Sequence, residues 1–314
     1  MSTLALRGPY WVTVRQHRRT LWLAGALVLL APTVVGGLRI WDLRTPDVLV
    51  EGRYRRADDN AGYDFLRGAM EQFSIGMLLL PLLVGAFVAG PLIAREFESR
   101  THELSFTQSV SPAAWLRAKL LTATAVALAT VLLLTLVYLT GHARTSGSWQ
   151  STWADRGPYE ITGTVLVAYV LLGIAVGSLV GLLVRRTLVA MAVTGGFVGV
   201  VMLALGVLRW DFLSVRTVTG PVLEPLTALN IPKDSVLADQ GLLTDTGQRL
   251  SGWFCSPDVP AAHCRPDADI TAQYADYHPA SHFWPLQLIE TGILLALAAL
   301  ALLAAFRVLR ARHP

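Results

Sequence analysis

The side chains best suited to metal chemistry lie toward the C-terminal part of this 314-residue chain: His263, Cys264, His278 and His282. His278 and His282 have the spacing H-x3-H. Pro279 stands between them, and a continuous helix presenting both imidazoles on one face is therefore disfavoured. No acidic residue completes an H-E-x-x-H arrangement. The sequence therefore predicts no metal site.

The sequence also lacks the residues that bind a nucleotide phosphate. A P-loop requires G-x-x-x-x-G-K-[ST], and the only lysines are Lys119 in WLRAKLL and Lys233 in NIPKDSV. Asp267 and Asp269 form an acidic pair in a polar stretch that is typical of solvated surface. We expect no cofactor in this chain.

Glu290 is the most notable single residue, because it interrupts an apolar stretch together with Gln287. A carboxylate inside a membrane helix is costly unless it faces a partner, a cavity or water. One hypothesis places Glu290 and Gln287 at an outer gate or along a substrate path. The alternative is a structural hydrogen bond to a neighbouring helix or loop.

Composition identifies the elements that must position these residues. Hydrophobic residues make up 53% of the chain and charged residues 15%, and the mean hydropathy is +0.49. Soluble domains contain roughly 25% charged residues, so this composition predicts an all-α polytopic membrane protein. The arginines stand beside apolar runs and form no compact basic domain, so we expect no nucleic-acid partner.

Six segments are long and apolar enough to cross a bilayer, which needs about 20 helical residues. They are Thr20–Leu38, Phe73–Ala94, Leu120–Thr140, Ile161–Val184, Thr187–Val207 and Pro285–Phe306. In the fourth, Gly173, Gly177 and Gly181 recur every four residues and predict close helix packing, with sliding between helices as a further possibility.

The distribution of charge predicts that both termini are cytoplasmic. With that orientation the inside segments hold half of the 26 bases but only three of the 22 acids. Residues 208–284 then form an extracytoplasmic loop, and this loop and residues 39–72 are long enough for short helices. Cys255 and Cys264 fall in the outer loop, where a disulfide is expected and two free thiols are the alternative.

The second and third spans are joined by a dense segment of mixed charge, AREFESRTHELSFTQSVSPAAWLRAK. Ser111 is expected to be an N-cap with Pro112 at the first helical position. Leu104 and Phe106 lie among acids and bases, a mixture that suits a docking surface. The alternative is a loop that is charged only because it contacts water.

This segment resembles the coupling-helix region of type-2 ABC exporter permeases, in which the family often has Gly in place of Arg100. The likeness lies in Arg-Glu-x-Glu, Arg-Thr-x-Glu-Leu and Ser-x-Ser-Pro, and His278–Trp284 resembles the entry to the sixth helix of actinobacterial members. The resemblance implies that residues 95–118 contact an ATP-hydrolysing subunit. The implied coupling residues are Arg95, Glu96, Glu98, Arg100, Thr101, Glu103, Leu104 and Phe106.

The resemblance also implies two copies of a separate ABC ATPase and a second permease subunit, identical or paralogous. Residues 1–19 would form an interfacial helix on membrane lipids, and a frayed basic tail is the alternative. The expected function is ATP-driven export of an amphiphilic substrate (drug, peptide antibiotic or lipid) across the cytoplasmic membrane. The alternatives are a polytopic membrane enzyme with an extracytoplasmic active site and a non-transporting immunity or sensory component.

Overall fold

The computed structural model describes residues 15, 18–45, 47–50, 53–55, 60–101, 111–146, 152–221, 229, 231–251 and 270–312. Within these residues, six helical segments are long and apolar enough to cross a membrane. They extend over Leu21–Asp42, Ala61–Glu98, Pro112–Thr145, Val165–Val184, Thr187–Asp211 and Ala280–Arg312. The predicted number of membrane-length helices, six, is confirmed.

The helices form one bundle. They are α2 (Arg18–Asp42), α3 (Ala61–Leu83), α4 (Gly90–Glu98), α6 (Pro112–Thr145), α7 (Pro158–Thr162), α8 (Val165–Val184), α9 (Thr187–Leu208) and α10 (Phe283–Arg312). A π-helix, η1 (Val84–Ala89), joins α3 to α4 without a break, and short 3₁₀ turns, η2 (Arg209–Asp211) and η4 (Ala280–His282), follow α9 and precede α10.

Local residues explain where several helices begin. Asn60 caps α3 by accepting a hydrogen bond from the Tyr63 amide, so the second span begins well before the expected Phe73. Ser111 accepts from the Ala114 amide at 3.3 Å with Pro112 in the first helical position, as predicted. The expected fourth span, Ile161–Val184, is instead divided near Gly163 into α7 and α8.

The core centres on α8. In the most apolar 18-residue stretch of this helix, 83% of the residues are buried, compared with 6% in the corresponding stretch of α2. The glycine ridge of α8 forms the seam with α3, η1 and α4. A Cβ added to Gly173 would lie 3.0 Å from the Pro81 carbonyl oxygen, and one added to Gly177 would lie 2.7 Å from the Ala89 Cβ. The close packing predicted from these glycines is confirmed.

Two long connections contain strands, one between α2 and α3 and the other between α9 and α10. The sequence had suggested short helices in both. A hairpin pairs β1 (Val48–Val50) with β2 (Arg53–Arg55). A second, antiparallel sheet has the order β3-β6-β4-β5, formed by β3 (Arg216–Pro221), β6 (Ile270–His278), β4 (Val236–Thr244) and β5 (Arg249–Ser251).

The four-stranded sheet is stabilised by pairing between distant segments and by a small apolar core. Val218 pairs with Ala275, and Leu242 pairs with both Leu250 and Gln273. Leu242 is 1% exposed and Leu250 is 8% exposed. Because strand pairing of this kind is long-range, the extended conformation was not evident from any one segment alone.

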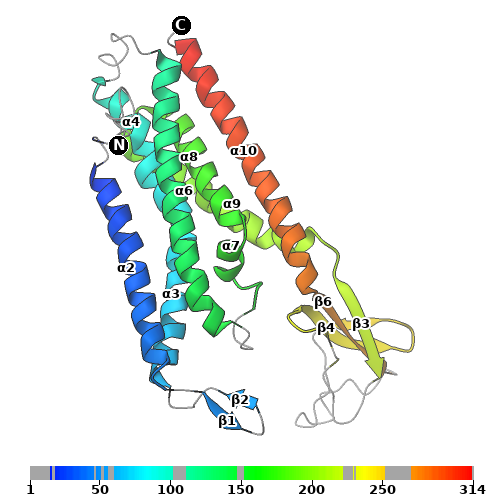
Figure 1. Ribbon diagram of the computed structural model, residues 1–314. Helices are drawn as coiled ribbons and strands as arrows, with labels where there is room; N and C mark the ends of the chain where they lie inside the picture. Colours follow the sequence, from blue (N-terminus) through cyan, green and yellow to red (C-terminus); the bar gives the residue numbers. More distant parts are fainter. Residues whose placement is uncertain are drawn as a thin grey trace.

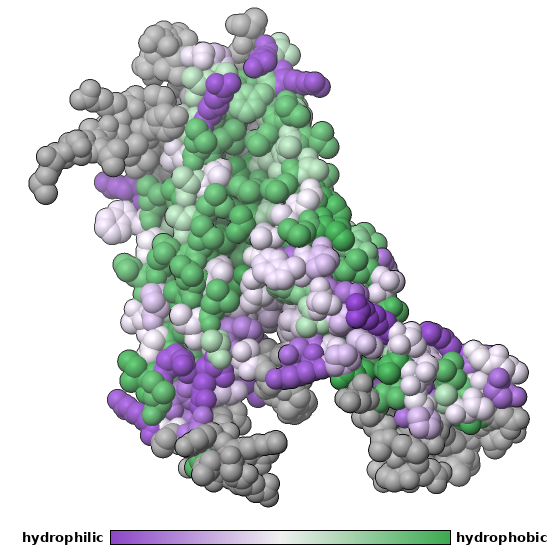
Figure 2. Space-filling model, turned by 45° about the vertical axis from the view of Figure 1, so that its right-hand side comes forward, coloured by the Kyte–Doolittle hydropathy of each residue, from purple (hydrophilic) through white to green (hydrophobic). Residues whose placement is uncertain are grey.

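The bundle has two different ends (Figure 1). The start of α2, the end of α4 and the end of α10 lie together at one end, which we call the coupling end, and both sheets lie at the opposite, sheet end. Figure 2 shows apolar surface over the middle of the bundle, with hydrophilic side chains gathered toward its ends. This arrangement is that of a multi-pass membrane protein with an even number of spans.

Candidate functional site

At the coupling end, Glu96 joins α4 to α6. The Lys119 ammonium donates to Glu96 Oε1 at 2.6 Å, and the Trp115 indole nitrogen donates to Glu96 Oε2 at 3.2 Å. The Lys119 ammonium also lies 5.2 Å from the centroid of the Trp115 ring. Lys119 is only 2% exposed, so Glu96 is an internal contact between the two helices that flank the predicted coupling segment.

Glu98 joins the same segment to α9. Its Oε2 accepts a hydrogen bond from the Thr187 amide at 2.9 Å and a second from the Thr187 hydroxyl. Thr187 is the first residue of α9, and the first amides of a helix lack partners within the helix. The carboxylate therefore caps α9 and places negative charge at the positive end of its dipole.

Three further predicted coupling residues are exposed in the last turn of α4 and just after it, an exposed edge made by Arg95, Arg100 and Thr101. Arg100 has a φ of 56°, in the left-handed region that favours glycine. This backbone geometry accounts for the preference for Gly that the resemblance indicated at this position. Glu103, Leu104 and Phe106 lie outside the described residues.

At the sheet end, Glu290 belongs to a buried ionic cluster. Glu290 is 0% exposed. Arg209 donates from Nε to Glu290 Oε2 at 3.0 Å, and the Tyr169 hydroxyl donates to Glu290 Oε1 at 2.7 Å. The partner that a carboxylate within a membrane helix requires is therefore an arginine that begins η2, directly after α9.

A second carboxylate completes the ionic cluster. Arg209 Nη2 donates to Glu160 Oε1 at 2.6 Å, while Glu160 Oε2 accepts from the Gly157 amide at 2.7 Å. The Arg209 guanidinium carbon lies 3.6 Å from the centroid of the Tyr159 ring. One guanidinium thus joins α7 and α10 at the end of α9, and Tyr169 links α8 to the same cluster through Glu290. The two carboxylates leave the group with one excess formal negative charge.

Gln287 bridges the break between α7 and α8. Its Oε1 accepts from the amides of Thr164 and Val165 at 2.9 and 3.1 Å, and its Nε2 donates to the Tyr159 carbonyl at 2.7 Å. These contacts are those of the structural alternative raised for Gln287 and Glu290. A role in gating stays a prediction.

Sequence reasoning identified Glu290 but missed Glu160 and Arg209. Both missed residues lie next to the ends of predicted spans, where charged residues are common and therefore do not indicate a site. One signal was available, because a carboxylate within the membrane needs a partner. That rule implies a base near Glu290 but does not identify it as Arg209.

The remaining chemical candidates do not form a site within the described part of the chain. His278 Nδ1 and His282 Nδ1 are 3.2 Å apart, and burial lowers the pKa of His278, which disfavours a charged pair. No group of three or more metal-binding side chains occurs among the described residues. The predicted disulfide and acidic pair lie outside them, as does His263: Cys255, Cys264, Asp267 and Asp269.

Six apolar helices, with the start of α2 and the end of α10 at the same end of the bundle (Figure 1), define a multi-pass helical membrane protein. Residues 23–209, more than half of the chain, match the family model described as "ABC-2 membrane transporter related". The chain therefore belongs to this family. It is an ABC-2 type permease, a class of transport component that works with an ABC ATPase subunit. No curated protein matched the sequence.

Proposed function

We propose that the protein is the permease subunit of an ATP-driven exporter in the cytoplasmic membrane, with both termini cytoplasmic. It would act with two copies of a separate ATPase subunit, which bind ATP and Mg²⁺, and with a second permease subunit, identical or paralogous. Residues 95–118 would be the segment that contacts the ATPase. The amphiphilic substrate class (drug, peptide antibiotic or lipid) follows from the family resemblance.

The observation that best supports this proposal is how the end of α4 is connected. Glu96 binds Lys119 of α6, and Glu98 caps α9. Arg95 and Arg100, close to these two acids, are exposed. A partner that moves the exposed edge would therefore move three membrane-spanning helices together, because the polar contacts link them.

The structure also improves the choice of test. Substituting Glu96 or Glu98 would disturb contacts inside the chain as well as any docking surface. Arg95→Glu with Arg100→Glu changes only exposed side chains. Lys233→Glu is the matched control, because Lys233 is an exposed base in the segment that precedes β4, at the sheet end.

The experiment is co-purification with a separately encoded ABC ATPase from the same genome, followed by a screen for substrates that stimulate ATP hydrolysis. We expect the double arginine variant to enter the membrane normally and to lose the ATPase, while Lys233→Glu retains it. Equal ATPase recovery from both variants would contradict the assignment of residues 95–118. An Arg100→Cys protein labelled from outside intact cells would contradict the orientation.

A further inference from the structure

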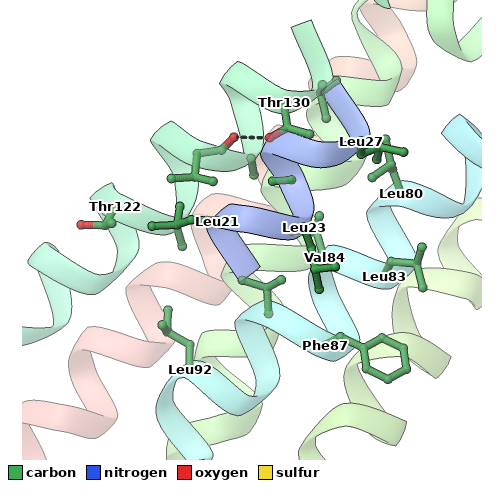
Figure 3. A pocket seen from close by; sticks show the side chains of 16 residues that line it. Leu21, Leu23, Leu27, Leu80, Leu83, Val84, Phe87, Leu92, Thr122 and Thr130 are labelled. Atoms are coloured by element: carbon green, nitrogen blue, oxygen red, sulfur yellow. Dashed lines mark hydrogen bonds between the residues drawn. The ribbon is translucent and has the colours of Figure 1, made fainter. Parts of the chain in front are cut away.

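A cleft of about 450 Å³ opens near the coupling end between three helical walls. Figure 3 shows side chains from α2, from the continuous α3–η1–α4 helix and from α6 around it. Leu27, Val84, Phe87 and Val126 are among the lining residues. Its volume falls within the roughly 300–1,000 Å³ that is usual for ligand sites.

The lining offers hydrocarbon contacts and no polar partner. Among the lining residues that the structure describes, Thr122 and Thr130 alone have polar side chains. The Thr122 hydroxyl donates to the Ala118 carbonyl at 2.8 Å. The Thr130 hydroxyl donates to the Val126 carbonyl at 2.9 Å, the dashed line in Figure 3. A buried water needs two to four polar partners, so hydrocarbon is the occupant that this lining favours.

Among the described residues, α2 is held most tightly to the bundle at the sheet end, and the cleft lies beside the other half of this helix. At the sheet end Val35 is 4% exposed, and Asp42 accepts hydrogen bonds from Arg144 at 3.0 Å and from Asn60 at 3.1 Å. Toward the coupling end, Leu23 is 72% exposed. The two ends of the same helix therefore differ in packing, and the space beside the loosely packed end is open to the bilayer.

Charge indicates which lipid fits. Arg18 is exposed and precedes the lining residue Leu21 by three residues, close to one helical turn. Across the cleft, Glu96 lies about one turn beyond the lining residue Leu92, and Lys119 compensates its charge. The cleft therefore ends near a base, Arg18, and the acid on its other side is neutralised by Lys119. This charge distribution favours a headgroup with a net negative charge.

We propose that this cleft holds an acyl chain of a resident anionic phospholipid drawn from the leaflet at the coupling end. The lipid fills the space beside α2 and contacts the π-helix η1. Because η1 continues into α4, the occupant touches the same continuous helix that carries Glu96 and Glu98. The inference concerns a lipid that stays bound, and it does not depend on which substrate is transported.

The test uses the full-length protein in vesicles that contain phosphatidylglycerol with a photoreactive acyl chain, and peptide mass spectrometry locates the cross-links. We expect cross-links at Leu27, Val84 and Val126. Ala24→Phe, which adds a ring to a lining position, should reduce them about tenfold, or about 1.4 kcal/mol of affinity. Ala26→Phe is the matched control, because Ala26 is exposed on the same helix and does not line the cleft.

The headgroup is tested separately with Arg18→Gln and with Arg310→Gln, an exposed base at the same end of the bundle. Arg18→Gln should lower cross-linking by phosphatidylglycerol several-fold while leaving the phosphatidylcholine analogue unchanged, and Arg310→Gln should alter neither. Ala127→Phe fills the cleft from α6 and provides a second test should Ala24→Phe fail to fold.

Three outcomes would overturn the proposal. The first is cross-linking spread evenly over lipid-facing residues such as Val200 and insensitive to Ala24→Phe. The second is cross-linking that appears only after residues 1–14 are removed, which would make the chain's own N-terminal segment the occupant. The third is ATP-dependent release of the probe by the complex with the ATPase, which would make the lipid a transported substrate.

Discussion

Replacing Arg209 by glutamine should destabilise the protein more than any change to its two carboxylate partners. Arg209 is 1% exposed and is the base in contact with both Glu160 and Glu290. Removing one partner of a buried ion pair typically costs about 3–5 kcal/mol. Arg209→Gln leaves two buried carboxylates without their cation, so we expect a loss toward the upper part of that range.

Glu290→Gln should cost less, about 1–2 kcal/mol, because Arg209 keeps Glu160 and the amide oxygen still accepts from Tyr169. The double variant Arg209→Gln/Glu290→Gln should then be more stable than Arg209→Gln alone, since it removes an orphaned charge. Contacting residues typically show coupling of about 0.5–3 kcal/mol.

The assay is reversible unfolding in mixed micelles, followed by circular dichroism as the denaturing detergent is increased. Arg307→Gln is the control, because Arg307 is an exposed arginine on α10. If Arg209→Gln unfolds at the wild-type midpoint, or if the two substitutions are additive, the ionic cluster does not hold the sheet end together as described.

Two further predictions concern the coupling end and the sheet. Lys119→Met should cost about 3 kcal/mol by leaving Glu96 without its cation, and Lys119→Met/Glu96→Gln should recover part of this loss in the same unfolding assay. Hydrogen bonds from the Ser251 hydroxyl and other donors lower the pKa of Asp239. Its stabilising effect is therefore present above its unfolded pKa, about 3.9, and is lost as the pH falls through the lower folded value. Hydrogen exchange of β5 should speed up at acid pH after correction for intrinsic rates, and Asp239→Asn should remove this pH dependence.

The membrane spans could be predicted from sequence because hydrophobicity and length alone define them. The Ser111 cap and the glycine ridge of Gly173, Gly177 and Gly181 are likewise local signals that predicted local structure. The sheet could not be predicted in this way, because the pairing of Val218 with Ala275 joins residues far apart in the chain.

The site residues show the same distinction between local signals and long-range contacts. Glu290 was recognisable from its own apolar surroundings, whereas Arg209 and Glu160 became identifiable only when folding brought three helices together. Glu96 and Glu98 were correctly placed beside a span, yet their contacts with Lys119 and Thr187 required the tertiary arrangement. The sequence thus identifies a charged residue that is costly to bury, whereas only the folded structure identifies the residue that pairs with it.

The pairing of β3 with β6 fastens the exits of two membrane helices to each other. β3 follows η2 at the end of α9, and β6 directly precedes η4 at the start of α10. Six paired positions, from Arg216 with Tyr277 to Pro221 with Ala272, must stay in register. Any opening of the bundle at the sheet end should therefore move α9 and α10 together, and spin labels on the ends of these two helices nearest the sheet should keep a constant separation throughout a transport cycle.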